Sequence, residues 1–153
     1  MNIYIFDIDG VLADLRHRLC YKNRGNFDMF YDDKNLLADG LIQPGRALLR
    51  IMNQDGIVVY ATGRPERTRQ ATIEWLNNNR LPLRAMLMRK DGDIRPSPEI
   101  KVEQVREILE SFSNIDKVWF IDDDPKNVAA VEEAFPLKAK IKVNGLVYGT
   151  ERL

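Results

Sequence analysis

The feature that most constrains the fold of this chain is an apolar run that ends, almost at the N-terminus, in Asp7-Ile8-Asp9-Gly10. Residues 3–6 are all apolar, which is typical of a strand that is buried on both faces. Two carboxylates after such a strand repel each other and lose hydration, so the arrangement is costly unless a positive charge compensates. The simplest compensation is a divalent cation with oxygen ligands, and the pattern therefore predicts a Mg²⁺ site.

Strand-like and helix-like segments alternate along the rest of the chain. The pattern predicts strands at residues 3–6, 57–61, 85–88, 118–121 and 139–143. It predicts helices at residues 26–34, 44–53, 66–79, 98–112 and 126–134, with N-caps at Asn26 and Ser97 and a turn at Asn144-Gly145. Such alternation implies right-handed crossovers and hence an α/β fold, a three-layer Rossmann-like sandwich with a mostly parallel sheet of about five strands.

Length and composition favour a single domain, residues 1–153, with a small cap or loop insertion at about residues 11–43. Hydrophobic residues make up 44% and charged residues 30%, as in globular proteins. No apolar run approaches the roughly 20 residues that span a bilayer, and the single Cys20 fits a reducing compartment, so we expect a cytoplasmic protein without membrane contact. Because 23 basic residues balance 23 acidic ones, long-range attraction to duplex nucleic acid is disfavoured, although a local basic patch can still bind a phosphate.

Polar triplets follow three of the predicted strands. They are Asp7-Ile8-Asp9, Thr62-Gly63-Arg64 and Asp122-Asp123-Asp124. Parallel strands end at one edge of a sheet, where ligands bind, so we expect the triplets to form one site. Acids around Mg²⁺ with a Lys and an Arg nearby suit phosphoryl transfer. Asp7 directly ends its strand and is the better nucleophile, forming an aspartyl-phosphate, while Asp9 can protonate the leaving oxygen and later activate water.

These segments resemble the haloacid dehalogenase (HAD) superfamily of phosphohydrolases. Its four motifs are matched, in chain order, by residues 6–11, residues 58–64, Lys101 and residues 120–123. A closer resemblance is to the 3′-phosphatase domain of bacteriophage polynucleotide kinase-phosphatases. It is carried by Thr62-Gly63-Arg64, by Arg89-x-x-Gly92-Asp93-x-Arg95 with Lys101 six positions on, and by Ile121-Asp122-Asp123. The sequence lacks the glycine-rich phosphate-binding loop of a kinase, so we expect no separate kinase domain in this chain.

The resemblance implies a role for each matched residue. The implied catalytic residues are Asp7, Asp9, Thr62 and Lys101. The implied Mg²⁺ ligands are Asp7, Asp9, Asp122 and Asp123, with Asp122 bound either directly or through another group. The implied substrate contacts are Gly63, Arg64, Arg89 and Arg95. By this resemblance Thr62 hydrogen-bonds the phosphoryl group, and Lys101 stabilises its charge and that of the nucleophile.

The short insertion at residues 11–43 bears on the substrate. It is too short for a large cap domain, so the site should admit a polymer end, which favours a polynucleotide 3′-phosphatase acting on a nucleic-acid 3′ end. A nucleotidase or another small-molecule phosphatase stays an alternative, because an open site also admits a nucleotide. A non-catalytic binding module with the same fold is a further alternative, which the intact Asp7 and Asp9 disfavour.

Four aromatic residues and the single histidine lie within this insertion. The aromatic side chains either pack together locally or offer a platform on which bases stack. They are Tyr21, Phe27, Phe30 and Tyr31. The histidine, His17, is predicted to be a surface or cap residue rather than a catalytic one.

Overall fold

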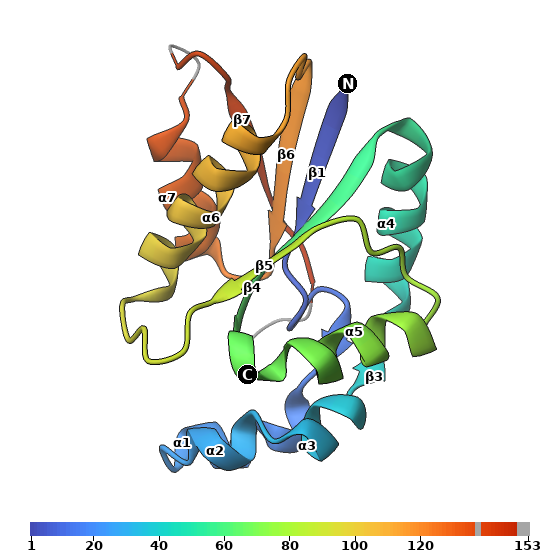
Figure 1. Cartoon of the computed structure of the whole chain (residues 1–153), viewed down its shortest axis with the longest axis vertical. Coiled ribbons are helices and arrows are strands. Elements are labelled where there is room, and N and C mark those ends of the chain that lie inside the picture. The colour runs from blue at the N-terminus through green and yellow to red at the C-terminus, as the bar shows by residue number, and fades with distance from the viewer. Residues whose placement is uncertain (137–138, 150–153) are drawn as a thin grey trace.

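The apolar run at the N-terminus forms β1 (Asn2–Phe6), the central strand of a five-stranded sheet with the order β5-β4-β1-β6-β7 (Figure 1). The other strands are β4 (Ile57–Pro65), β5 (Met86–Arg89), β6 (Lys117–Asp122) and β7 (Val143–Val147). Every neighbouring pair in this sheet is parallel, which confirms the predicted α/β fold. The structure is a computed structural model and describes residues 1–136 and 139–149.

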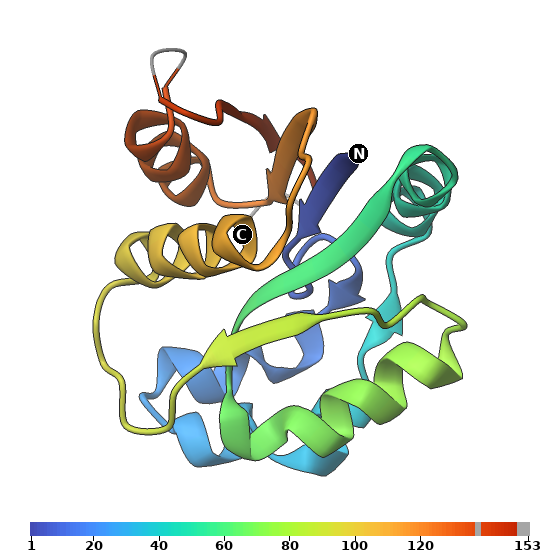
Figure 2. The same ribbon diagram turned by 45° about the horizontal axis from the view of Figure 1, so that its top comes forward.

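Helices cover both faces of the sheet and give it three layers. They are α4 (Gln43–Asp55), α5 (Arg69–Asn78), α6 (Ser97–Ser111) and α7 (Pro125–Ala134). Successive residues of a strand point to opposite faces. Tyr4 and Phe6 therefore belong to the core beneath α4 and α5, whereas Ile3 and Ile5 belong to the core beneath α6 and α7. Figure 2 shows the two helix pairs on opposite sides of the sheet.

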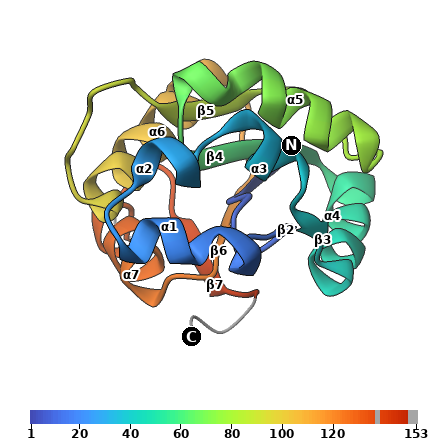
Figure 3. The same ribbon diagram turned by 90° about the horizontal axis from the view of Figure 1, so that it is seen from below.

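The chain between β1 and α4 forms a small structure that we call the cap, residues 13–41. Its two ends pair as an antiparallel ribbon, β2 (Ala13–Asp14) with β3 (Gly40–Leu41). Between them lie a short 3-10 helix (Arg16–Arg18) and the helices α1 (Leu19–Asn23), α2 (Phe27–Phe30) and α3 (Asp33–Leu37). Figures 1 and 3 show α1, α2 and α3 across the end of the sheet at which β1 and β6 finish. The cap therefore lies over the edge where the polar triplets were expected to meet.

The helix predicted at residues 26–34 is wrong in extent, because the chain forms two short helices there. Asn26 does cap the first one, accepting a hydrogen bond from the Met29 amide at 3.2 Å. The chain leaves the helix at Tyr31, and Asp32 then caps α3 by accepting from the Lys34 amide at 3.2 Å. Asp and Asn side chains compete in this way for local amides and favour new helix starts over continued helices.

Two other local predictions are wrong. Ser97 is the first residue of α6 rather than its cap, and the capping position holds Pro96, which makes no side-chain hydrogen bond. The last strand begins at Val143 and not at residue 139, so Asn144-Gly145 is part of β7 and not a turn. A Cβ on Gly145 would lie 2.5 Å from the Val128 side chain, so this glycine allows β7 to approach α7 closely. Among the residues that the structure describes, no helix is long and apolar enough to cross a membrane.

Candidate active site

Three carboxylates gather at the carboxyl end of the sheet. Asp7 directly follows β1, and its amide continues the strand pairing by donating to the Ile121 carbonyl at 2.9 Å. Asp122 is the last residue of β6, and Asp123 follows it. One carboxylate oxygen from each of the three acids lies within 4.8 Å of the others. The topology thus brings together acids more than a hundred residues apart in the sequence.

Lys101, on α6, forms ion pairs with two of these carboxylates. Its ammonium donates to Oδ1 of Asp7 at 2.8 Å and to the Ala61 carbonyl, and lies 3.4 Å from Oδ2 of Asp122. The side chain is almost fully buried, so these ion pairs are shielded from water and salt. Lys101 therefore joins β1, β4 and β6 at one point.

The carboxylates and the ammonium of this cluster shift each other's pKa values. Burial raises the pKa of Asp7 well above its usual range, and Asp122 and Asp123 add to this rise, although Lys101 opposes it. Burial lowers the pKa of Lys101, but Asp7 and Asp122 outweigh burial and raise that pKa above its usual value. Three carboxylates that lie so close together favour the binding of a divalent cation between them.

The donor set fits Mg²⁺. Carboxylate oxygens are the hard ligands that this ion prefers, and Asp7, Asp122 and Asp123 each offer one. Asp122 also accepts from the Asp124 amide at 2.8 Å and from Nδ2 of Asn127 at 3.1 Å, which orients its carboxylate. A ligand oriented in this way needs no reordering when an ion binds.

Gly10 makes room for the third acid. It has φ of +84°, which side chains other than glycine rarely adopt, and a Cβ there would lie 2.1 Å from Oδ2 of Asp123. A larger residue at this position of the Asp-x-Asp-Gly pattern would clash with Asp123. It lets the turn after β1 pass close to the carboxylate that follows β6.

Asp9 is not part of the carboxylate cluster, so the structure brings together only three of the four predicted metal ligands. Oδ1 of Asp9 instead accepts from Nη2 of Arg18 at 2.8 Å and from Nη2 and Nε of Arg64 at 2.8 and 3.1 Å. Both guanidiniums also donate to Asp39, Arg18 at 2.7 and 2.9 Å and Arg64 at 3.0 Å. We call Asp9, Arg18, Asp39 and Arg64 the four-charge network, two positive and two negative.

The four-charge network fixes the protonation of Asp9. Burial raises the pKa of this carboxyl, but Arg64 and Arg18 outweigh burial and hold the pKa at about 2. The Asp9 carboxylate is therefore ionised at neutral pH. Since Arg18 and Arg64 both bind Oδ1, the orientation of the carboxylate is fixed as well.

A register shift in β4 explains where its polar triplet points. The pairing of β4 with β5 is irregular between Ala61 and Pro65, as in a β-bulge, which redirects side chains. Thr62 and Arg64 are fully buried, and Arg64 is directed to Asp9 rather than to the cavity. Arg64 was predicted to contact substrate; in the structure it donates to Asp9 and does not line the cavity, whereas Gly63 does. Oγ1 of Thr62 accepts from the Arg64 amide at 3.1 Å.

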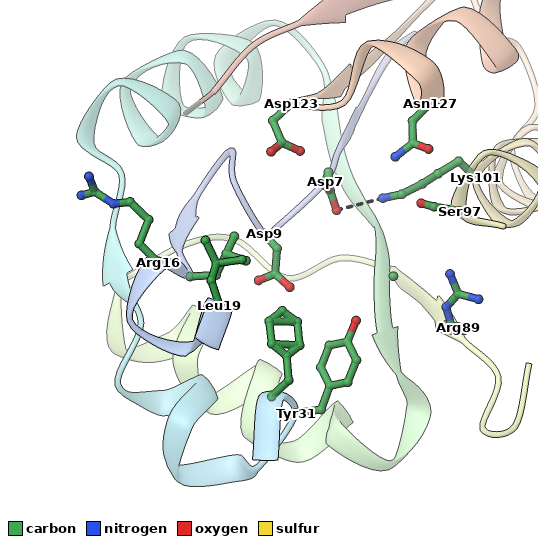
Figure 4. A pocket seen from close by; sticks show the side chains of 13 residues that line it. Asp7, Asp9, Arg16, Leu19, Tyr31, Arg89, Ser97, Lys101, Asp123 and Asn127 are labelled. Carbon is green, nitrogen blue, oxygen red and sulfur yellow. Dashed lines mark hydrogen bonds and ion pairs between the residues drawn. The ribbon is translucent and has the colours of Figure 1, made fainter. Parts of the chain in front are cut away.

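A cavity of about 210 Å³ lies between the carboxylate cluster and the cap (Figure 4). Its lining residues are Asp7, Asp9, Leu15, Arg16, Leu19, Phe30, Tyr31, Gly63, Arg89, Ser97, Lys101, Asp123 and Asn127. The side towards the sheet is polar, and the side towards the cap is mostly apolar. The cavity therefore offers charged groups to a phosphoryl group on the sheet side and a mostly apolar surface to the organic part of a phosphate ester on the cap side.

Two of the predicted substrate arginines differ in their position. Arg89 lines the cavity, and its Nη1 donates to the carbonyls of Asp93 and Arg95 at 2.9 and 2.8 Å. Arg95 does not line this cavity and forms ion pairs with Asp93 and Glu103 at 2.7 and 2.6 Å. The structure thus gives Arg95 a place in the loop before α6 and gives Arg89 access to a ligand.

Several residues of the site had no predicted role. Arg18 and Asp39 complete the four-charge network, and Ser97 lines the cavity. The cluster Arg16-His17-Arg18 soon after the Asp-x-Asp-Gly pattern was a signal for Arg18, whereas nothing in the sequence marks Asp39. His17 lies in the cap as predicted, with Nε2 2.7 Å from Oδ1 of Asp39.

The comparisons with known proteins agree with this geometry. Residues 1–134 match the family model of the polynucleotide kinase PNKP phosphatase domain. No curated protein sequence matches the chain. Among solved structures, a chain of a Pnkp1/Rnl/Hen1 complex is 22% identical with a TM-score of 0.67, over 97% of this chain and 47% of that one. A chain of the Pnkp1/Rnl/Hen1 RNA repair complex is 24% identical with a TM-score of 0.70, over 94% of this chain and 43% of that one.

The fold extends to relatives of similar length. A haloacid dehalogenase-like hydrolase from Streptococcus pneumoniae is 12% identical with a TM-score of 0.64, over 97% of this chain and 86% of that one. The chain spans less than half the length of the two chains from the Pnkp1 complexes. Because the family match covers most of the sequence and the fold is that of HAD hydrolases, the chain belongs to the family of the polynucleotide kinase PNKP phosphatase domain.

Proposed function

We propose that this chain is a Mg²⁺-dependent phosphomonoester hydrolase that removes a 3′-phosphate from the end of a polynucleotide through an aspartyl-phosphate on Asp7. The observation that carries the proposal is the Asp7 carboxylate, which lines the cavity 2.8 Å from Lys101 and within 4.8 Å of oxygens of Asp122 and Asp123. Mg²⁺ bound to these three carboxylates would offset part of their negative charge and would attract the entering phosphate.

The residues divide the reaction into two displacements. In the first, an oxygen of Asp7 bonds to phosphorus, the bond from phosphorus to the ester oxygen breaks, and Asp9 gives that oxygen a proton. In the second, Asp9 takes a proton from water, the water oxygen bonds to phosphorus, and the bond from phosphorus to Asp7 breaks. Lys101 offsets negative charge on Asp7 and on the phosphoryl oxygens in both displacements.

Asp9 must be protonated before the first displacement, and its pKa of about 2 disfavours that form until substrate binds. A phosphate ester brings negative charge beside Asp9, and a like charge raises the pKa of a carboxyl group. Substrate binding therefore favours the protonated form of Asp9. Once the ester oxygen has left with the proton, the ionised form is ready to activate water.

The family match and the guanidinium of Arg89 support a polynucleotide as the substrate. The family is that of a polynucleotide kinase phosphatase domain, and one similar structure is part of an RNA repair complex. Arg89 lines the cavity and donates to two carbonyls, and within residues 1–136 and 139–149 it forms no close ion pair, although, together with Arg95, its charge helps to lower the pKa of Asp93. A guanidinium in that position suits a phosphate of the polynucleotide.

A nucleotidase is the second candidate, and the size of the cavity favours it. A volume of about 210 Å³ is below the range of roughly 300–1,000 Å³ that is usual for drug-sized ligands. Such a cavity accommodates a phosphoryl group and one neighbouring group, which a mononucleotide would supply. Both candidates share the same chemistry at Asp7.

Release of phosphate from matched substrates separates the candidates. The panel contains an oligonucleotide with a 3′-phosphate, the same oligonucleotide with a 5′-phosphate, 3′- and 5′-nucleoside monophosphates, and an aryl phosphate, each with Mg²⁺ and with EDTA. The proposal predicts the highest kcat/KM for the 3′-phosphorylated oligonucleotide and no turnover in EDTA. A mononucleotide as the better substrate would establish the nucleotidase instead.

A further inference from the structure

The cavity has one wall that the phosphoryl chemistry does not use. Leu15, Leu19, Phe30 and Tyr31 come from the cap, and we call them the cap wall. Figure 4 shows Leu19 and Tyr31 across the cavity from Asp7, with the hydroxyl end of Tyr31 directed into it. A phosphate ester with its phosphorus at Asp7 would therefore place its organic part against the cap wall.

Tyr31 is held firmly in this wall. Its ring lies edge-on to that of Phe30, with centroids 4.7 Å apart and planes at 68°. The guanidinium of Arg67 lies 5.9 Å from the Tyr31 ring centroid, and that of Arg18 lies 4.5 Å from the Phe30 centroid. Tyr31 is thus fixed before any ligand enters, so a ligand that contacts it loses little affinity to side-chain ordering.

Phe30 also connects the cap wall to the four-charge network. It is buried, and its carbonyl accepts from Nη1 of Arg18, the same side chain that holds Asp9. One guanidinium thus connects the cap wall to the carboxylate of Asp9 through hydrogen bonds.

The chemistry of the wall selects a nucleoside. Two leucines and two aromatic rings offer few hydrogen-bond partners to the hydroxyls of a sugar or polyol phosphate, which disfavours such esters. A nucleobase is planar and apolar on its faces, and contacts between bases and aromatic side chains stabilise nucleic-acid complexes largely independently of sequence. The cavity volume leaves room for about one such unit beside the phosphoryl group.

We propose that the cap wall, with Tyr31 at its centre, is a subsite for the base of the terminal nucleoside that carries the 3′-phosphate. This assignment rests on the proposed function and adds to it the requirement for a base next to the scissile phosphate. Any of the four bases fits, since the wall offers surface and few hydrogen bonds. The enzyme should therefore distinguish a terminal nucleoside from a terminal abasic sugar.

The test compares two ends in two variants. The substrates are one oligonucleotide with a 3′-phosphate on an ordinary terminal nucleoside and the same oligonucleotide with a 3′-phosphate on a terminal abasic sugar. The unaltered chain should show a KM for the ordinary end that is roughly 5- to 100-fold lower than for the abasic end. Tyr31→Ala should bring the two KM values together, whereas Tyr31→Phe, which keeps the ring, should preserve most of the difference.

Phe27→Ala is the matched control. Phe27 is the first residue of α2, the short helix that ends just before Tyr31, and its ring centroid lies 6.5 Å from that of Phe30, but it is half exposed and does not line the cavity. Its loss should leave the preference for the ordinary end as it is. If Phe27→Ala and Tyr31→Ala have the same effect, or if Tyr31→Ala raises both KM values equally, the cap wall is not a base subsite.

Binding measured without turnover separates this inference from the proposed function. In an Asp7→Asn background, the affinity for fluorescently labelled versions of the two oligonucleotides reports on the subsite alone. Loss of the preference in Asp7→Asn/Tyr31→Ala supports the subsite even where the unaltered chain releases no phosphate from either oligonucleotide, a result that would overturn only the polynucleotide phosphatase. Turnover with equal affinity for both ends overturns only the subsite.

Discussion

Asp39 carries a negative charge where its side chain is 0% exposed, and Asp39→Asn is therefore a sharp perturbation of the way Asp9 is held. Oδ1 of Asp39 accepts from Arg18 and contacts His17, and Oδ2 accepts from Arg18 and Arg64. Whichever way the new amide is turned, its NH₂ group replaces an oxygen that accepts from a guanidinium. The substitution keeps the shape but leaves two positive charges with one carboxylate.

The cost to stability follows from burial. Removing one partner of a buried ion pair typically costs about 3–5 kcal/mol. For a chain of this length each kcal/mol lowers the melting temperature by about 2–4 °C, so a decrease of roughly 6–20 °C is expected. Differential scanning calorimetry measures it directly.

The cost to activity should depend on the leaving group. Asp9 loses its fixed orientation, and misplacing a positioned catalytic group can cost about 100-fold in rate. An alkyl ester such as a nucleoside 3′-phosphate needs a proton on its leaving oxygen, so kcat should fall about 100-fold for it. An aryl phosphate leaves with little help from an acid, and its kcat should fall less than about 10-fold. Both rates are measured below the melting temperature of the variant.

Leu36→Ala supplies the control. Leu36 is fully buried in α3 of the same cap, and its truncation should cost about 2–5 kcal/mol without changing any charge. It should lower the melting temperature by a similar amount and leave the ratio of the two rates unchanged. Equal losses on both esters in Asp39→Asn would refute the idea that Asp39 acts through Asp9.

Three further substitutions test the rest of the site. Asp7→Asn should abolish turnover, and in EDTA it should raise the melting temperature by a few degrees because one of three clustered carboxylates is removed; residual Mg²⁺-dependent turnover would contradict its role as nucleophile. Because burial raises the pKa of Asp7 above 3.8, the metal-free protein should also lose stability as pH rises from that value through the raised pKa, and the variant should lack this loss. Gly10→Ala would place a Cβ 2.1 Å from Oδ2 of Asp123 and should weaken Mg²⁺ binding at least ~10-fold by titration calorimetry, whereas unchanged affinity would separate Asp123 from the metal. Arg95→Ala removes exposed ion pairs, including that with Glu103, and should leave the melting temperature and KM nearly unchanged; a large rise in KM would indicate that Arg95 contacts the substrate.

The sequence predicts which edge of the sheet holds the site, because the position of that edge depends on only a few physical rules. Apolar runs mark the strands, parallel pairing follows from the alternation with helices, and polar residues after the runs must then meet. Asp7, Asp122 and Asp123 come together for this reason. Lys101 was found by its spacing within a motif, and its position beside Asp7 is consistent with that assignment.

Features that depend on irregular backbone could not be predicted. The β-bulge in β4 turns Arg64 away from the cavity, and strand periodicity alone gives no sign of it. Asp39 meets Arg18 across 21 residues of short helices and turns, whose path depends on two successive caps. The sequence predicted that the last strand ends before Asn144-Gly145, because Asn-Gly is a strong turn signal. In the structure Gly145 lies within β7, where the absence of a side chain allows the close approach of α7.

Arg18 belongs to the cap and Arg64 to the sheet, yet both donate to the same oxygen of Asp9. This shared oxygen connects the cap to the sheet at Asp9. A cap taken from a relative would restore the chain only if it brought an arginine and an aspartate in the places of Arg18 and Asp39. Substitutions at Leu15, Leu19 and Tyr31 could therefore alter substrate preference without touching this network, whereas a change at Arg18 or Asp39 would also disturb how Asp9 is held.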